Sequence, residues 1–270
     1  MRKPRFSPTA LAAAGLLACA GSAQALATAT ATATATASLS NFQVQVFDLN
    51  LADGIAASVT FGSGASSYVD VYAEAFNGTW VYNSDSDSNL AGTALSVSAA
   101  NGNVSASARL TAGNFFILGS GPGASVSASA FGLYSYAEGT VLLLSSGFTL
   151  SKNAQLVFSA NTSGVTATRT LAGEWAYSYA FISLFSSGYS QSSFSKSYAY
   201  ASDSGNESNN VASVQVSVEN LTSADVTGHA TAVAYAEVAG VTVVPEPETY
   251  ALMLAGLLMI GAVARRRNTR

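Results

Sequence analysis

The feature that most constrains the fold is an alternation of apolar and polar side chains that recurs over residues 42–244. An extended strand turns alternate side chains to opposite faces, so this pattern predicts β-strands with one buried face. Turn sequences such as Asn101-Gly102 and Ser204-Gly205-Asn206 separate the segments, which is typical of antiparallel strands joined by short connections. The clearest alternating segments are residues 42–46, 67–76, 95–99, 103–110, 125–130, 175–181, 211–218 and 226–244.

These short strands predict an all-β fold, with one antiparallel β-sandwich or jelly-roll-like domain over residues 41–244. The Ala/Thr repeat within residues 26–40 has no large side chain to bury. Such a segment either pairs as a strand of weakly fixed register or forms a low-complexity spacer, and we favour the spacer. The single cysteine, Cys19, cannot form an intrachain disulfide, so packing and strand pairing must supply the stability.

Residues 1–25 have the layout of a secretory signal peptide. Cations within residues 1–8 precede an apolar run over residues 11–20, and the small-residue triplet Ala23-Gln24-Ala25 follows. We therefore expect a signal-peptide helix, cleavage after the triplet, and export of the rest of the chain. The residues around Cys19 also resemble a bacterial lipobox, in which this cysteine would carry a lipid.

Residues 249–264 form an uncharged apolar stretch that three arginines follow. At about 1.5 Å per residue a helix of this length spans about 24 Å, which crosses a bilayer if the membrane thins locally. We expect a C-terminal transmembrane helix here, and the positive-inside rule assigns the arginines to the cytoplasm and residues 41–244 to the outside.

The tripeptide Pro245-Glu246-Pro247 stands directly before this apolar stretch. A Pro-Glu-Pro motif, an apolar helix and an arginine cluster in this order resemble the PEP-CTERM sorting signal, over residues 244–270 of this chain. The resemblance implies recognition by exosortase, a membrane-embedded cysteine protease or transpeptidase of bacteria that make exopolysaccharide. It implies the recognition motif at Pro245, Glu246 and Pro247, a transient membrane anchor at residues 249–264, and a stop-transfer cluster at Arg265, Arg266 and Arg267, with residues 245–270 as the sorting signal.

Composition argues against several functional classes. Residues 26–244 keep 13 of the chain's 15 acids and 4 of its 11 bases, so their net charge of −9 repels nucleic acid. One histidine, His229, and no cysteine cannot supply the usual ligands of zinc. Catalysis by a nucleophile and a base would depend on His229, and no G-x-S-x-G motif accompanies it. We expect a protein that is not an enzyme and has no cofactor.

Carboxyl pairs leave one catalytic alternative open. A glycosidase needs two carboxyl groups about 5–10 Å apart. Asp70 and Glu74 share a strand face, but four residues at about 3.3 Å each separate them by about 13 Å. A pair across strands among Glu74, Glu138, Glu174 and Glu237 stays possible.

Residues 83–89 contain Asp85, Asp87 and Asn89 at alternate positions, as in the first half of a calcium loop. The match ends there, because Leu90 replaces the turn glycine and Ser96 stands in place of the bidentate glutamate. We treat these residues as a weak calcium candidate and favour a polar loop tip.

Aromatic side chains are the most informative feature of residues 41–244. Tyr68 and Tyr72 share a predicted strand face with Glu74, and the valines between them can serve as the buried face. Tyrosines beside a carboxylate suit glycan contact, by stacking and hydrogen bonding. The aromatic residues of 175–181 also share one face, and we favour the sandwich interior for them because cores need such volume.

Together these features predict an exported, non-enzymatic protein that reaches the cell envelope, the cell surface or the extracellular matrix and associates with exopolysaccharide there. The expected partners are exosortase, exopolysaccharide and, through the transient anchor, the membrane, but not nucleic acid. Three alternatives stay open: a carbohydrate-binding module that uses exposed tyrosines, a structural protein that self-associates through strand edges, and a plain membrane-anchored envelope protein.

Overall fold

The computed structural model describes residues 32–62, 66–76, 80–90, 94–111, 123–131, 135–144, 147–187, 191–240 and 253–260. The predicted signal peptide, Cys19, the Pro-Glu-Pro motif and the arginine cluster lie outside the described residues. The chain divides into a β unit of residues 31–242 and a second unit formed by residues 1–30 and 243–270.

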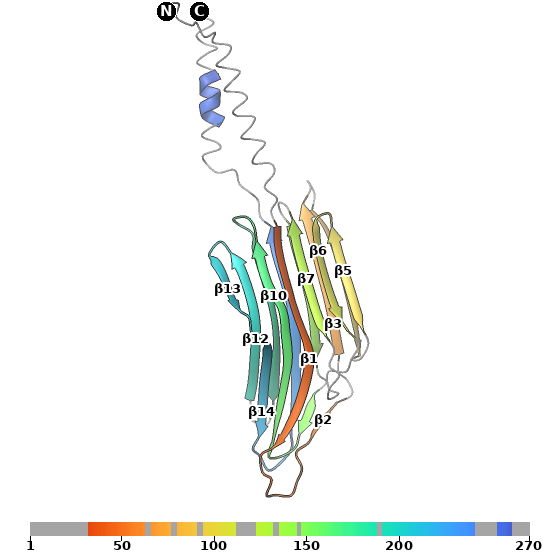
Figure 1. The fold of residues 1–270 in the computed structure, drawn as a ribbon. Coiled ribbons are helices and arrows are strands. Elements are labelled where there is room, and N and C mark those ends of the chain that lie inside the picture. Colours follow the sequence, from red (N-terminus) through yellow and green to blue (C-terminus); the bar gives the residue numbers. More distant parts are fainter. Residues whose placement is uncertain are drawn as a thin grey trace, which may run out of the picture. The chain divides into compact units, whose positions relative to one another are not determined.

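The β unit consists of two antiparallel sheets (Figure 1), as the alternation predicted. Sheet A has the order β14 (Ser213–Asn220), β10 (Ala154–Arg169), β1 (Thr32–Asp48), β7 (Ala124–Phe131), β6 (Val104–Leu110) and β5 (Leu95–Asn101). Sheet B has the order β13 (Gly205–Asn209), β12 (Gln191–Ser202), β11 (Trp175–Ser186), β15 (Val226–Gly240), β8 (Ser135–Leu144), β3 (Ser66–Phe76) and β4 (Trp80–Leu90). The short strands β9 (Phe148–Leu150) and β2 (Val59–Phe61) extend sheet B beside one end of β15.

The two sheets pack face to face around one core in which alanine is the most frequent residue. Central strands of both sheets contribute fully buried alanines, such as Ala35 of β1, Ala128 of β7 and Ala234 of β15. Small side chains on both layers leave room only for a thin interior. Larger side chains fill one end of the sandwich, where the Phe61 ring meets the Phe158 ring edge-on at 5.9 Å.

The spacer predicted for residues 26–40 is wrong from Thr32 onward, because β1 begins there and lies between β10 and β7. Its alanines are buried against sheet B. Its threonines point outward and bond across the strand pair, as Thr34 Oγ1 and Thr168 Oγ1 do at 2.7 Å. The repeat has a fixed register because neighbours pair with it on both sides.

Hydrogen bonds connect the two sheets at both margins of the sandwich. At one margin Asn83 Nδ2 of β4 donates to the carbonyl of Ala100 in β5 at 3.3 Å. At the other, the Ser217 amide of β14 donates to Ser193 Oγ of β12 at 3.3 Å. The edge strands β4 and β5 are therefore joined across the sandwich at one margin, and at the other the edge strand β14 is joined to β12, the neighbour of the edge strand β13.

The residues of the calcium candidate lie on a strand, so the predicted polar loop tip is wrong. Asp85 and Asp87 belong to β4 and pair with Val71 and Val69 of β3, whose side chains face the core. Both aspartates are exposed because β4 is the edge strand of sheet B. Charges that point inward on an edge strand oppose pairing with another chain.

The second unit contains one described helix, residues 253–260. Among the residues that the structure describes, no helix is long and apolar enough to cross a membrane. The predicted transmembrane segment, residues 249–264, extends beyond the described helix on both sides.

Candidate functional site

The outer surface of sheet B carries many of the aromatic side chains of the chain, and we call this surface the aromatic face. Every tyrosine that the structure describes lies on the aromatic face, because each occupies a strand position whose side chain points away from the core. These residues are Tyr68, Tyr72, Tyr82, Tyr136, Tyr177, Tyr179, Tyr198, Tyr200 and Tyr235, and Trp175, Phe181 and Phe194 join them.

The interior position predicted for the aromatic residues of 175–181 is wrong. Ala176, Ser178 and Ala180 are fully buried, and the aromatic residues between them face outward and are partly exposed. The interior between the sheets is too thin for a row of rings, because both layers fill it with alanines. The aromatic side chains that sequence reasoning placed in the core therefore lie on the surface.

The register of sheet B places carboxylates between tyrosines. Tyr177 of β11 pairs with Glu237 of β15, Glu237 pairs with Glu138 of β8, and Glu138 pairs with Tyr72 of β3. In the next row the Tyr179 and Tyr235 rings stack with centroids 4.9 Å apart and planes 23° from parallel. The face thus combines ring surfaces with hydrogen-bond acceptors.

The predicted glycan-contact residues lie together on this face. Tyr68, Tyr72 and Glu74 point outward from β3, and the valines between them are buried, which confirms the predicted orientation of this strand. Tyr68 is 39% exposed. Tyr72 stacks on Tyr82 of β4, with ring centroids 6.2 Å apart and planes 13° from parallel.

The structure brings one carboxyl pair together, Glu138 with Glu237. The hydroxyl oxygen of Tyr136 lies 2.7 Å from Glu138 Oε2 and 2.7 Å from Glu237 Oε1, and the Tyr235 hydroxyl donates to Glu237 Oε2 at 2.8 Å. Burial, together with these hydrogen bonds to carboxylates, raises the pKa of Tyr136 and of Tyr235 well above the usual range. Both hydroxyls therefore stay protonated donors at neutral pH.

This pair does not have the arrangement of a glycosidase. A retaining glycosidase places the reacting sugar carbon between its two carboxyl groups. Here the hydroxyl of Tyr136 bridges the two carboxylates of Glu138 and Glu237 and fills that gap. Glu74 lies across from Tyr136 on the next strand, and Glu174 is buried at a turn.

Lys196 of β12 is the cation that the described residues place on the aromatic face. Its Nζ lies 5.0, 4.6 and 5.3 Å from the ring centroids of Tyr177, Tyr179 and Tyr198, and it donates to the Tyr177 hydroxyl. An ammonium group over tyrosine rings is attracted by the negative ring faces. Sequence reasoning missed this cluster because it depends on the pairing of β11 with β12.

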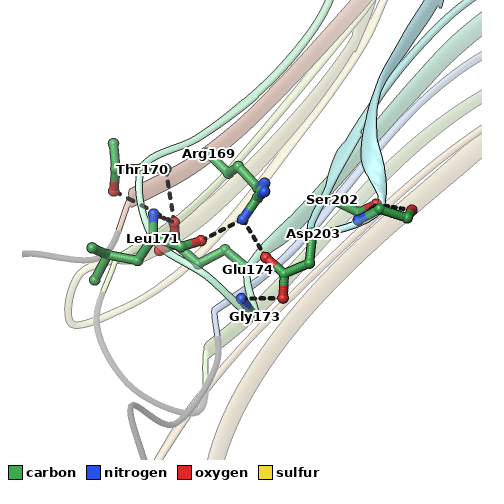
Figure 2. Close-up of polar contacts among 8 residues, drawn as sticks. Arg169, Thr170, Leu171, Gly173, Glu174, Ser202 and Asp203 are labelled. Carbon is green, nitrogen blue, oxygen red and sulfur yellow. Dashed lines mark hydrogen bonds and ion pairs between the residues drawn. The ribbon is translucent and has the colours of Figure 1, made fainter. Parts of the chain in front are cut away.

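An open depression borders the aromatic face where the turn between β10 and β11 meets the turn between β12 and β13. Figure 2 shows Arg169 in an ion pair with Asp203, which also accepts a hydrogen bond from the Gly173 amide at 2.7 Å. Glu174 Oε2 accepts from the amides of Thr170 and Leu171 at 2.8 and 2.7 Å, so this carboxylate holds the turn. The lining residues are Gly173, Glu174, Trp175, Tyr177, Tyr200, Ser202, Asp203 and Ser204.

The other candidate residues are not assembled into a site. His229 lies on the outer face of β15, and its ring centroid is 5.0 Å from that of Phe185. Within the described ranges, no three His, Cys, Asp or Glu side chains gather in a way that could hold a metal ion. Asp85 and Asp87 therefore have no third ligand of these types among the described residues.

Comparison with known proteins assigns the tail of the chain. No curated protein and no solved structure matches the chain. Residues 243–267 match the family model of the PEP-CTERM protein-sorting motif, which includes Pro245, Glu246 and Pro247 and the arginines at 265–267. The match confirms the resemblance of the tail, and a tail of this kind targets a protein for export to the envelope or surface and for processing by exosortase. The chain therefore carries a PEP-CTERM sorting motif at residues 243–267.

Proposed function

We propose that the protein is a non-enzymatic component of the cell surface or the exopolysaccharide matrix and that its aromatic face binds glycan. The observation that carries this proposal is the array of partly exposed tyrosines and carboxylates across sheet B. The C–H faces of sugar rings stack on aromatic rings, and sugar hydroxyls donate hydrogen bonds to carboxylates.

The size of the face favours a polymer over a single sugar. It runs from β12 to β4 over six strands, which at about 4.8 Å between neighbours is about 24 Å. A surface of this width accommodates several linked sugar rings. Exopolysaccharide is the neighbour that a sorting tail of this kind implies, so the proposed ligand is present where the protein is sent.

Two observations support binding without catalysis. Tyr136 occupies the space between Glu138 and Glu237 that a reacting sugar would need, and His229 lies beside a phenylalanine ring. Self-association through strand edges has less support, because the Ala/Thr repeat is central in sheet A and hydrogen bonds join the edge strands β5 and β14 of sheet A to strands of sheet B.

The test is retention of the full-length chain on exopolysaccharide from the cells that make the protein. Tyr68→Ala together with Tyr72→Ala removes two stacking rings, and we expect binding to weaken about tenfold, since aromatic contacts contribute about 0.5–1.5 kcal/mol each. Phe131→Ala is the matched control, because this ring is 36% exposed on the outer face of sheet A. It should leave retention unchanged.

Equal retention of the double variant and the parent chain would contradict the role of the face. Release of shortened sugar chains that stops with Glu138→Gln would contradict the non-enzymatic part of the proposal. Circular dichroism and thermal unfolding of each variant check that the fold is intact.

A further inference from the structure

The aromatic face has an excess of negative charge that the described residues do not neutralise. Its carboxylates outnumber its one cation, Lys196, which bonds to a tyrosine hydroxyl. The one ion pair found among the described residues, between Arg169 and Asp203, lies at the edge of the face and leaves these carboxylates without a cationic partner. The carboxylates are Asp70, Glu74, Glu138, Glu207 and Glu237.

Glu138 and Glu237 carry this excess to the centre of the face. They are direct cross-strand partners, and like charges in such a position destabilise a sheet. The Tyr136 hydroxyl has one proton but lies 2.7 Å from an oxygen of each carboxylate, so one of these two contacts has no proton in it. The pair therefore has acceptor capacity that the neighbouring hydroxyls cannot fill, since each carboxylate offers about four lone-pair sites.

Lys196 demonstrates which kind of group this surface accommodates. Its ammonium lies within 5.3 Å of three ring centroids, and one of these rings belongs to Tyr177, the cross-strand partner of Glu237. Rings supply attraction to a cation, and carboxylates supply acceptors for its protons. At the other end of this row, Tyr72 and Glu138 repeat the combination of ring and carboxylate without a described lysine beside them.

We infer that the aromatic face recognises a basic polysaccharide, one whose sugar rings carry free amino groups. This inference rests on the proposed glycan-binding function and names the class of glycan. The protonated amines would lie at Glu138 and Glu237 while the sugar rings stack on the neighbouring tyrosines. A polymer of uronic acids would bring carboxylates against carboxylates, and a neutral polymer would leave the central pair unneutralised.

The test compares soluble oligosaccharides of equal length, titrated into the full-length chain at a pH where amines are protonated. The probes are a glucosamine hexamer, the matching N-acetylglucosamine hexamer, which lacks the charge, and a hexamer of glucuronic acid. We expect the glucosamine hexamer to bind about tenfold more tightly than the acetylated one at low salt, with the difference shrinking as salt rises.

The variant Glu138→Gln with Glu237→Gln removes two charges and keeps a carbonyl oxygen at each position to accept from Tyr136 and Tyr235. It should bring the binding of the two hexamers to within about twofold of each other. Asp85→Asn with Asp87→Asn is the matched control, because it removes the same charge from the opposite side of sheet B. The control should keep the tenfold difference.

Each remaining outcome decides against one of the two proposals. Equal or tighter binding of the acetylated or the uronic acid hexamer would overturn the basic glycan and leave glycan binding standing. Poly-lysine that competes as well as the glucosamine hexamer, amine for amine, would overturn it too, because charge alone would then suffice. If neither the hexamers nor exopolysaccharide from the producing cells bind, the proposed function itself fails.

Discussion

Tyr136 and Tyr235 are the residues that fix the centre of the aromatic face. Their hydroxyls bond to the carboxylates of Glu138 and Glu237, which orients the rings and the carboxylates together. A buried hydroxyl that donates to a carboxylate resists losing its proton, because the phenolate would be both desolvated and repelled. The pKa of Tyr179, stacked on Tyr235, is raised as well, first by burial.

These raised pKa values predict a loss of stability in alkali. An unfolded tyrosine releases its proton near pH 10, whereas Tyr136 and Tyr235 keep theirs in the folded chain. Above that pH the unfolded state therefore binds fewer protons than the folded state, and the free energy of unfolding falls as pH rises. Urea midpoints should be flat from pH 8 to about pH 9.5 and fall steeply beyond about pH 10.

The paired variant Tyr136→Phe with Tyr235→Phe should make this decline shallower, and Tyr82→Phe, whose side chain is 68% exposed, should not. A decline of the same slope in the parent chain and in the paired variant would show that other groups cause it.

At the scale of strands, alternation predicted the elements but not their partners. Each of the eight alternating segments overlaps a strand, and residues 241–244 of the last segment lie outside the described residues. Sequence reasoning missed β4 and β12. Serine and asparagine in β4, and serine and tyrosine in β12, leave no clear difference in polarity between the two faces of each strand. The faces of β11 could be separated from its sequence, yet the choice of the inward one depended on alanines of β1 and β15, far away in the chain.

The candidate site was predictable only in part for the same reason. Tyr68, Tyr72 and Glu74 lie on one strand, so their shared face follows from the sequence. The pairing of Glu138 with Glu237 depends on the register between β8 and β15, which no local pattern encodes.

The thin interior predicts an asymmetric response to added volume. Ala35→Leu in the centre of β1 adds three carbons to a site with no exposure, so we expect the free energy of unfolding to fall by about 1–3 kcal/mol. Ala100→Leu makes the same change on the exposed side of β5 and should alter it by less than about 0.5 kcal/mol. Urea denaturation measures both, and equal effects of the two substitutions would contradict an interior packed to capacity.

For the whole molecule, strand pairing fixes where the chain enters and leaves the β unit. β1 begins beside Phe131 and β15 ends beside Ser135, and these two residues belong to consecutive strands, β7 and β8. The chain therefore enters and leaves the sandwich at the same end.

Processing near Pro245, Glu246 and Pro247 would then release a complete β unit, since β15 ends at Gly240. Because the matched motif continues through residue 267, cleavage there removes the arginines at 265–267 from the mature protein. We expect intact-mass measurement on protein from the envelope or the medium to give a chain without them. Replacing all three motif residues with alanine should retain the arginines in every molecule. If the parent chain also keeps them in every molecule, it is a plain membrane-anchored envelope protein and the tail acts as a permanent anchor.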